Sequence, residues 1–201
     1  MKLVLASNNP GKLLEIRALF QSARLPFELV SQSALGIAEA AEPHGTFLEN
    51  ALAKARHASR ACGLPALADD SGLCVDGLDG APGVHSALYA GGPRSDARNN
   101  QRLLAETAKL AERRAHYACV MVLVRRADDP QPLVAEGIWR GEVALAPRGS
   151  GGFGYDPLFW LPEHGRTAAE LDPQEKNRIS HRGIALARLL ERLREEAWWP
   201  A

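Results

Sequence analysis

Apolar runs alternate with polar turns along the chain, and the first run, at residues 2–6, is short and partly β-branched. The polar residues Ser7, Asn8 and Asn9 follow it, and Pro10 then opens a stretch with an apolar stripe at helical spacing. This pattern predicts a strand, a turn and a helix. Asn9 is the expected N-cap, and Pro10 takes the first helical position, where its missing N–H costs nothing.

A second helix is predicted to begin at Thr46. Thr46 and Glu49 have the spacing of a capping box, apolar residues continue at helical spacing, and Gly63 ends the pattern. We therefore interpret Glu49 as a capping residue. Residues 66–68 then predict a brief buried strand that ends where a run of polar residues begins.

Glycine and proline are frequent in residues 72–93, which leaves room for a short strand near 73–75 and otherwise for a long loop. Long loops in compact domains are often functional. The later pattern predicts a helix over 95–110, a central strand over 117–126, an antiparallel partner strand over 133–144, a short apolar segment over 158–161, and a helix from Ser180 to about Glu196. Helices and strands are intermixed, which predicts an α/β fold with a mixed sheet.

Composition and charge fit one domain over residues 1–201 and exclude several functions. Lys+Arg and Asp+Glu both number 24, so no positive excess favours a nucleic-acid partner. The longest apolar run, at 118–124, is far shorter than the roughly 20 residues of a spanning helix, so we expect no membrane partner. No signal-peptide pattern precedes Ser7, which predicts a cytoplasmic location. The widely spaced Cys62, Cys74 and Cys119 fit reduced thiols, so any metal should be bound by oxygen.

Residues 7–12 combine the features of a phosphate-binding turn. A helix start offers free N–H groups, Gly11 allows close approach, and Lys12 supplies a positive charge. The segment does not match the Walker pattern, and helix capping explains every residue except Gly11 and Lys12. Anion binding and a capped helix with a solvated lysine are therefore both open.

Asp69 and Asp70 directly follow the predicted buried strand. Two adjacent carboxylates repel each other, so the pair is costly unless a cation holds it. Magnesium, which binds one or two carboxylates and substrate phosphates, fits this position, with Glu42 as a further ligand. The plainer alternative is an aspartate pair in a turn before Ser71 and Gly72. The place after a strand, where ligands of α/β sheets collect, favours the metal.

Two further groups of polar residues lie on predicted helices. Asn50, Lys54 and His57 share one helix face, for which solvent exposure is expected, although Lys54 could reach a phosphate. His181 and Arg182 lie at the start of the last helix, where cations oppose the helix dipole. An anionic or carbonyl-bearing ligand would remove that conflict.

Six sequence blocks occur in order from residue 3 to about 190, which is nearly the whole chain. Each block alone is a weak signal, but together they resemble the inosine triphosphate pyrophosphatase family. The blocks are SNNPGK at 7–12, TFLENA at 46–51, ADDSGL at 68–73, GAPG at 80–83, GFGYDP at 152–157, and Lys176 with SHRG at 180–183.

The resemblance implies a two-lobed α/β protein with a long twisted mixed β-sheet flanked by helices, a central nucleotide cleft and a homodimer. It implies a magnesium-dependent hydrolase that converts XTP, ITP and dITP to the monophosphate and pyrophosphate. Asp70 would be the proton acceptor and a metal ligand, and Glu42, with Glu39 as its nearest alternative, the other metal ligand. Nucleotide contacts would come from Ser7, Asn8, Asn9, Pro10, Gly11, Lys12, Ser71, Phe153, Gly154, Tyr155, Asp156, Lys176, His181 and Arg182, which Lys54 could join through its charge.

The chemistry of hydrolysis agrees with these roles. Attack at the α-phosphorus expels pyrophosphate, so a positioned water must lose a proton while negative charge develops on the leaving group. Asp70 can take the proton, and Lys12 and Lys176 can supply fixed positive charge around the phosphates.

The purine base offers a basis for selection. Inosine and xanthine carry an acceptor at the 6-position and adenine a donor, so His181 and Arg182, which can both donate, would favour the former and be left unpaired by ATP. Phe153 or Tyr155 could stack on the base. The residue that rejects GTP is left open.

Two other classes of function stay open at this point. One is a phosphohydrolase that releases the γ-phosphate, and the other is a nucleotide-binding module without turnover. A pyrimidine or modified-base substrate is a milder variant. The sequence also leaves open the dimer interface and whether Trp198 and Trp199 pack on a partner subunit or on the last helix.

Overall fold

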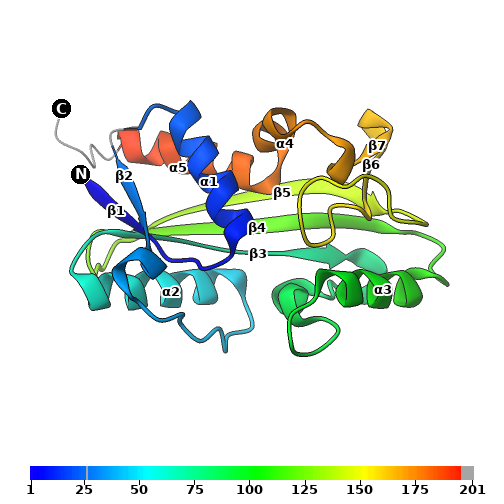
Figure 1. Ribbon diagram of the computed structural model, residues 1–201, viewed down its shortest axis with the longest axis horizontal. Coiled ribbons are helices and arrows are strands. Elements are labelled where there is room, and N and C mark those ends of the chain that lie inside the picture. Colours follow the sequence, from blue (N-terminus) through cyan, green and yellow to red (C-terminus); the bar gives the residue numbers. More distant parts are fainter. Residues whose placement is uncertain (26, 196–201) are drawn as a thin grey trace. The chain divides into compact units, whose positions relative to one another are not determined.

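The computed structural model describes residues 1–25 and 27–195, so the predicted roles of Glu196, Trp198 and Trp199 lie outside it. The strands form one seven-stranded sheet in the order β2-β1-β3-β4-β5-β6-β7 (Figure 1). The helices are α1 (Pro10–Ser22), α2 (Phe47–Cys62), α3 (Asp96–Thr107), α4 (Pro173–Ile179) and α5 (His181–Glu195). The strands are β1 (Lys2–Leu5), β2 (Glu28–Ser31), β3 (Ala66–Val75), β4 (Arg114–Val124), β5 (Leu133–Val143), β6 (Phe159–Leu161) and β7 (Arg166–Thr167).

The sheet is mixed, which confirms the predicted fold class. Strand β1 pairs in parallel with β2 and with β3, whereas β6 pairs antiparallel with β5 and with β7. Strands β4 and β5 are neighbours joined by a turn, as the predicted hairpin requires. Strand β2 and helix α4 were not predicted from the pattern.

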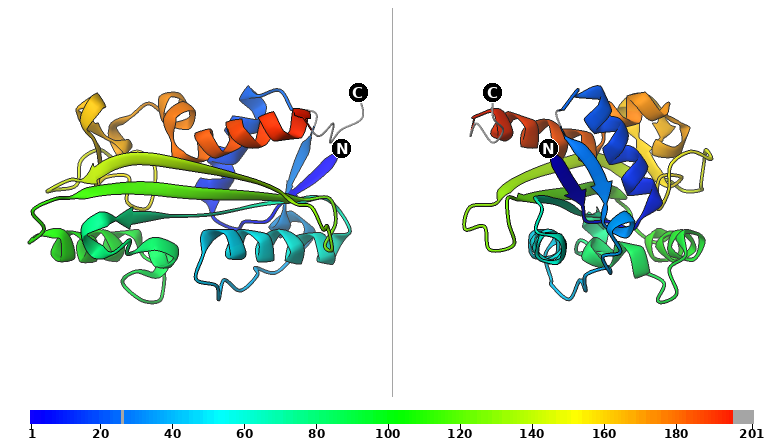
Figure 2. Two further views of the ribbon diagram at one scale, coloured as in Figure 1. Left: turned by 180° about the vertical axis from the view of Figure 1, so that it is seen from behind. Right: turned by 60° about the vertical axis from the view of Figure 1, so that its left-hand side comes forward.

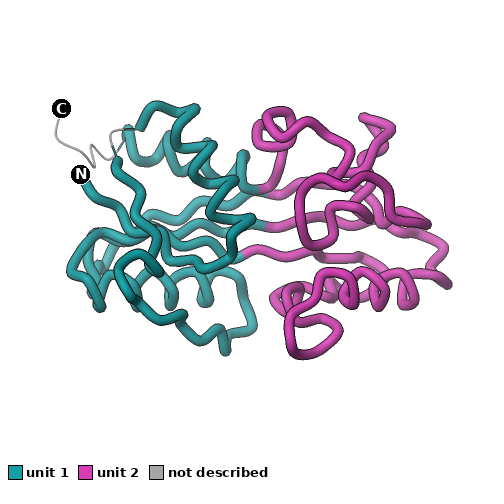
Figure 3. The backbone as a smooth tube through the Cα atoms, viewed as in Figure 1, with its two compact units in different colours: residues 1–70, 119–137, 182–201 teal, residues 71–118, 138–181 magenta. Residues whose placement is uncertain are grey.

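The chain divides into two compact units, each made of segments that are separate in sequence (Figure 3). Unit 1 contains residues 1–70, 119–137 and 182–201, and unit 2 contains residues 71–118 and 138–181. Each unit has a core and candidate functional residues of its own.

The core of unit 1 has two layers because successive side chains of a strand point to opposite faces. Leu3 and Leu5 of β1 pack among residues of α1 and α5, whereas Val4 and Ala6 pack against the alanines of α2. Accordingly, α1 and α5 lie on one face of these strands and α2 lies on the other, as both Figure 1 and the rear view in Figure 2 show.

The helix ends of unit 1 follow the predicted caps. The Asn9 side chain accepts hydrogen bonds from the N–H groups of Gly11 and Lys12, with Pro10 in the first helical position of α1. Thr46 caps α2, and Gly63 ends that helix at φ +70°, a backbone conformation that glycine adopts without strain. Local sequence chemistry therefore fixes where both helices start.

The core of unit 2 is rich in aromatic rings. Tyr117 of β4 lies edge-on to Phe159, with the ring centroids 4.7 Å apart, and Trp139 of β5 lies 5.0 Å from Phe159. Leu103 of α3 and Leu171 are buried in the same cluster. In Figure 1, α3 and α4 cover opposite faces of this unit's strands.

Strand β3 corrects one prediction. The pattern suggested two short strands separated by polar residues, but β3 runs without interruption from Ala66 to Val75 and contains both Asp69 and Asp70. Aspartate is disfavoured in strands, and the prediction missed the cations that neutralise this pair. Beyond Val75 the predicted long loop is confirmed, since only two short 3₁₀ turns, Asp76–Leu78 and Gly83–Leu88, interrupt it before α3.

Two expectations from composition can be compared with the structure. Within residues 1–25 and 27–195, no helix is long and apolar enough to cross a membrane. Cys62, Cys74 and Cys119 are all free thiols, which confirms the prediction that they are reduced.

The turn between β4 and β5 is organised by Asp129, whose side chain is fully buried. Its carboxylate accepts hydrogen bonds from the Arg125 guanidinium through Nε and Nη2, from the Arg125 N–H, and from the Gln131 N–H, at 2.8 to 3.0 Å. The hydrogen bonds from the Arg125 side chain hold the pKa of the Asp129 carboxyl well below its usual range. The charged form is thus part of the folded turn.

Asp129→Asn removes this charge and should lower the free energy of unfolding at pH 7 by about 2–3 kcal/mol, the usual worth of hydrogen bonds to a charged group. Because the folded-state pKa is depressed, the wild-type advantage is complete above about pH 4, the ordinary pKa of aspartate, and is lost as the pH falls through the folded value. Urea unfolding at pH 7 and at low pH measures the difference in free energy of unfolding between wild type and Asp129→Asn.

The control is Asp128→Asn, since the Asp128 side chain is 84% exposed. Its effect should stay within about 0.5 kcal/mol at both pH values. A difference between wild type and Asp129→Asn that does not shrink at low pH would contradict the role of the charge.

Candidate active site

Asp69 and Asp70 are neighbours in β3 and therefore point to opposite faces of the strand. Leu67 packs in the core layer of α1 and α5, and Ala68 in that of α2. By the same alternation Asp69 belongs to the α1 and α5 face and Asp70 to the α2 face. Each carboxylate is buried and has its own cations.

The Asp69 carboxylate lies between two cations. The Lys12 ammonium from α1 is 3.1 Å from Asp69 Oδ2, and Arg182 Nε from α5 donates to the same oxygen at 3.2 Å. Arg182 also donates through Nη1 to Glu15 of α1 at 2.8 Å. Burial opposes ionisation of Asp69, but the charges of Lys12 and Arg182 outweigh it and hold the pKa of this carboxyl well below its usual range.

For Lys12, unlike Asp69, the effect of burial on the pKa outweighs the effect of the neighbouring charge. Burial lowers the pKa of the ammonium below the ordinary value even though Asp69 favours the charged form. Arg182, by contrast, has its pKa raised despite burial, because Glu15 and Asp69 both stabilise its charge. The four groups form one ion-pair network within unit 1.

The Asp70 carboxylate pairs with Lys54 of α2. The Lys54 ammonium donates to Asp70 Oδ1 at 2.9 Å and to Glu42 Oε1 at 2.7 Å, so it bridges the two carboxylates predicted to bind metal. Burial alone would lower the pKa of Lys54, but Asp70, Asp69 and Glu42 raise it above its ordinary value. Burial raises the pKa of the Asp70 carboxyl, against the opposing charges of Lys54 and Lys12.

The donor set around Asp70 suits a hard cation. Asp70 Oδ2 is buried and has no hydrogen-bond partner in the described part of the chain. Glu42, whose side chain is 41% exposed, presents a second carboxylate on the same lysine. No group of three or more His, Cys, Asp or Glu side chains that could hold a metal occurs among residues 1–25 and 27–195. Magnesium needs only one or two carboxylates when phosphates complete its shell, so the residues fit it.

The structure bears on one of the two interpretations of the predicted phosphate-binding segment, the capped helix with a solvated lysine. Asn9 is committed to capping α1, Ser7 Oγ accepts from the Asn9 N–H at 3.3 Å, and Asn8 accepts from Gln32 at 3.1 Å. Pro10 and Gly11 begin α1. The capped helix is thus confirmed, but the part-buried Lys12 pairs with the buried Asp69 and is not the expected solvated lysine.

The polar face of α2 corrects a second prediction. Solvent exposure was expected for it, yet Asn50 and Lys54 are buried. The Asn50 side chain accepts from the His44 N–H and donates to the His44 carbonyl, at 3.0 and 3.2 Å, and so fixes the segment that follows Glu42. His57 Nε2 lies 2.9 Å from the Ala38 carbonyl. The face is polar because it holds the loop before α2, an interaction that helical periodicity does not reveal.

Glu49 forms one of the two hydrogen bonds of the predicted capping box. The Glu49 N–H donates to Thr46 Oγ1 at 3.2 Å, and the Thr46 hydroxyl donates to the Glu49 carboxylate at 2.6 Å. Thr46 therefore caps α2 as predicted, but the Glu49 carboxylate contacts the Thr46 hydroxyl and not the Thr46 N–H that the predicted capping box requires.

In unit 2, the predicted loop at residues 152–156 is organised by Asp156. Its Oδ2 accepts from the Phe153 N–H at 2.8 Å and from the Lys176 ammonium at 2.6 Å, and both Asp156 and Lys176 are buried. The ammonium also lies 5.3 Å from the centre of the Phe153 ring. The structure therefore brings together the predicted residues Phe153, Asp156 and Lys176.

Two other predicted contacts of unit 2 are buried in its core. Tyr155 is 3% exposed and its hydroxyl donates to the Ser86 carbonyl at 2.8 Å, which leaves Phe153 as the ring of this loop that can stack on a base. The His181 ring stacks on Tyr117, with centroids 4.6 Å apart and planes 7° apart. Ser71 begins this unit's part of β3, and Gly72 after it packs against Gly83 too closely for any side chain.

Sequence reasoning missed Glu15, which neutralises Arg182 together with Asp69. A carboxylate one helical turn after Lys12 was the available signal. The conflict between Arg182 and the helix dipole is thus removed by these two carboxylates within the protein. The contact of Arg182 with the substrate base stays a prediction.

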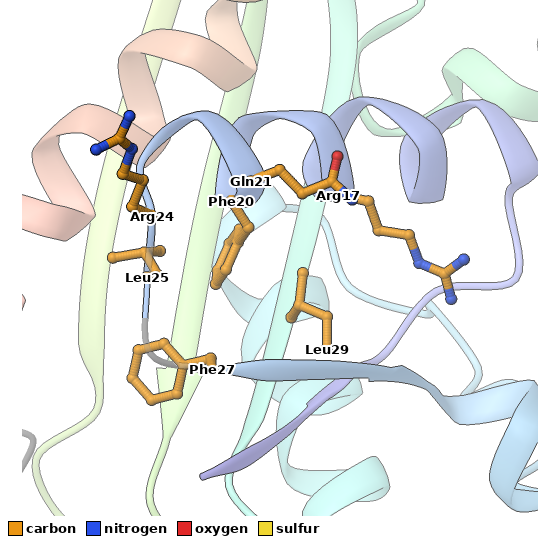
Figure 4. Close-up of a pocket in the computed structure, with 7 residues that line it drawn as sticks. All are labelled: Arg17, Phe20, Gln21, Arg24, Leu25, Phe27 and Leu29. Carbon is orange, nitrogen blue, oxygen red and sulfur yellow. The ribbon is translucent and has the colours of Figure 1, made fainter.

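Unit 1 also has a cavity of about 470 Å³ beside α1 and β2 (Figure 4). It contains none of the residues predicted to act on a nucleotide. Its lining consists of Arg17, Phe20, Gln21, Arg24, Leu25, Phe27 and Leu29.

Comparison with known proteins adds independent information. The Ham1 family model matches residues 3–192. A dITP/XTP pyrophosphatase of Ralstonia nicotianae is 65% identical over 196 residues, covering 96% of each chain. A dITP/XTP pyrophosphatase of Nitrosomonas europaea is 62% identical, covering 99% of this chain and 97% of the relative. The solved structure of a HAM1 protein from Coxiella burnetii is similar with a TM-score of 0.89 and 49% identity, covering 97% of this chain and 99% of that one.

Two glycines of the 152–156 loop provide a test of its geometry. Gly152 and Gly154 both have positive φ, at +70° and +64°, so alanine at either position costs about 1 kcal/mol in backbone strain. Only at Gly152 would the new Cβ meet Asp156 Oδ2, at 2.0 Å. Gly152→Ala should therefore lower the free energy of unfolding by about 1–3 kcal/mol more than Gly154→Ala.

Chemical denaturation of the two alanine variants measures the difference directly. Equal losses of stability would mean that Asp156 does not occupy the position described here.

Proposed function

This chain belongs to the Ham1 family, and from that premise we propose that it is a nucleoside triphosphate pyrophosphatase. Its substrates are the deaminated purine nucleotides XTP, ITP and dITP, which it converts to the monophosphate and pyrophosphate. Names of relatives at 62–65% identity support the substrate class. The activity removes damaged purines from the nucleotide pool.

The observation that carries the proposal is the environment of Asp70. This buried carboxylate shares Lys54 with Glu42 and keeps one oxygen, Oδ2, without a hydrogen-bond partner in the described residues. An unsatisfied buried acceptor costs about 1–3 kcal/mol, and Glu42, the other carboxylate on Lys54, is part-exposed. A catalytic role or a bound water or ion accounts for such groups in native structures.

Asp70 and Glu42 would hold Mg²⁺, the cofactor that we propose. When bound, the ion would neutralise the negative charge that develops on the pyrophosphate leaving group. Asp70 also accepts the proton of the water that attacks the α-phosphorus.

The positive groups of the candidate site act on the phosphates. Lys54 and Lys12 are held in fixed positions by Asp70 and Asp69, so their charges need little reorganisation when a polyphosphate binds. The backbone N–H groups at the start of α1 are a further anion site. Lys176, held by Asp156 in unit 2, is proposed to contribute a third ammonium.

We assign base recognition to Phe153, His181 and Arg182. Phe153 stacks on the purine, and His181 and Arg182 donate toward its 6-keto group. The stacking of His181 on Tyr117 fixes the imidazole plane, and Glu15 with Asp69 fixes the guanidinium. Fixed donors reject adenine because its 6-amino group offers no acceptor.

We further propose that the enzyme is a homodimer located in the cytoplasm. We propose no nucleic-acid partner and no membrane partner for it. Its balanced charge supports the absence of a nucleic-acid partner.

The deciding experiment is the analysis of products from dITP, XTP, dATP and dGTP with and without Mg²⁺. The wild type should release pyrophosphate from dITP and XTP only when Mg²⁺ is present. Asp70→Asn and Glu42→Gln should each lower kcat by on the order of 10²-fold or more, because they remove a proton acceptor or a metal ligand.

Matched controls make the same chemical change on exposed carboxylates. Asp128→Asn and Glu191→Gln should leave the rate within about twofold of wild type. Release of inorganic phosphate without pyrophosphate would instead indicate γ-phosphate hydrolysis, and no turnover with Mg²⁺ would indicate a binding module. Either result would overturn the proposed function.

A further inference from the structure

The first turns of α3 hold the backbone of the 152–156 loop. Asp96 Oδ2 accepts from the Gly154 N–H at 2.7 Å, and Asn100 Nδ2 donates to the Gly154 carbonyl at 2.8 Å. Asp96 and Asn100 are four residues apart and so lie on one face of the helix. Both polar backbone atoms of a single glycine are therefore bound by side chains of one helix.

These contacts are chemically specific. A carboxylate can only accept, which matches the Gly154 N–H, and the amide of Asn100 provides the donor that the carbonyl requires. The bond from Gly154 to Asp96 is charge-assisted and belongs to the stronger class of hydrogen bonds. Exchanging the two side chains would reverse the match.

Helix α3 is itself firmly placed within unit 2. Ser95 caps it, and Leu103 is fully buried in the core. Asn99, also buried, accepts from the Ala90 N–H at 2.8 Å and donates to the Ala87 carbonyl at 3.0 Å. A rigid element of this kind can fix a loop that contains no helix or strand.

The loop carries a glycine on each side of Phe153. Gly152 and Gly154 flank this ring on both sides, and Asp156 accepts from the Phe153 N–H at 2.8 Å and donates its own N–H to the Phe153 carbonyl at 3.3 Å. Glycine gives a chain large conformational freedom, so ordering such a segment on ligand binding costs affinity unless it is ordered beforehand. The contacts from α3 supply the order on the side of Gly154.

We propose that Asp96 and Asn100 are positioning residues, which hold Gly154 so that the Phe153 ring is ready to stack on the purine base. This inference rests on the proposed function for the identity of the base. Neither side chain touches the substrate. Asp96 and Asn100 act through the backbone of residues 153–155. They affect substrate binding and not the chemical step.

The kinetic test uses four variants, with dITP as substrate. Asp96→Ala and Asn100→Ala should each raise KM by about five- to tenfold, the equivalent of one lost hydrogen bond, and change kcat by less than about threefold. Asp96→Asn keeps an acceptor oxygen and should restore KM to within about twofold of wild type. Gln101→Ala, an exposed amide on the same helix, is the matched control and should change neither constant.

Asp96→Asn also separates loop positioning from helix stability. Asp96 is an acidic residue in the first turn of α3, where its charge favours the helix dipole. If stabilising the helix through its charge were the whole role of Asp96, Asp96→Asn would raise KM as much as Asp96→Ala does. Such a result would overturn the inference.

A second measurement does not depend on activity. Hydrogen–deuterium exchange of the segment 150–157 should be faster by about fivefold or more in Asp96→Ala and Asn100→Ala than in wild type, and unchanged in Gln101→Ala. Unchanged exchange in the two alanine variants would overturn the positioning role, even if the wild type proved inactive on dITP. Faster exchange with an unchanged KM in an active enzyme would overturn its connection to substrate binding.

Discussion

The structure depends on one constraint of strand geometry, which is that two adjacent side chains must leave a strand on opposite faces. Asp69 and Asp70 are both buried in β3, and a buried carboxylate without a partner costs several kcal/mol. Each therefore needs its own cation from its own face. Helix α1 supplies Lys12 to Asp69, and α2 supplies Lys54 to Asp70. The packing of these two helices on the sheet therefore also neutralises the two carboxylates.

The two faces have different capacities for chemistry. On the α1 and α5 face, Asp69 is enclosed with Lys12, Arg182 and Glu15, and its low pKa keeps it ionised. On the α2 face, Asp70 shares one lysine with Glu42, whose side chain is part-exposed. The first face stabilises unit 1 and fixes the lysine at the start of α1. The second face is where we propose that a cation and a proton are accepted.

Local chemistry predicted much of this fold, because caps depend on residues three or four positions apart. Asn9, Thr46 and Gly63 mark helix ends as expected. The continuity of β3 and the burial of Lys54 could not be predicted in this way, since both depend on partners far along the chain. The pair of Arg182 with Asp69 joins residues 113 positions apart. Sequence blocks identified the candidate residues, but only the structure shows which carboxylate each cation neutralises.

The most direct measurement of the division between the two faces is the affinity for Mg²⁺, determined by calorimetry on the full chain without nucleotide. Asp70→Asn should weaken binding by about tenfold or more, the usual effect of disturbing a metal site. Asp69→Asn, the same change one residue earlier, should alter it by less than about threefold. Equal losses in the two variants, or a larger loss for Asp69→Asn, would contradict the account.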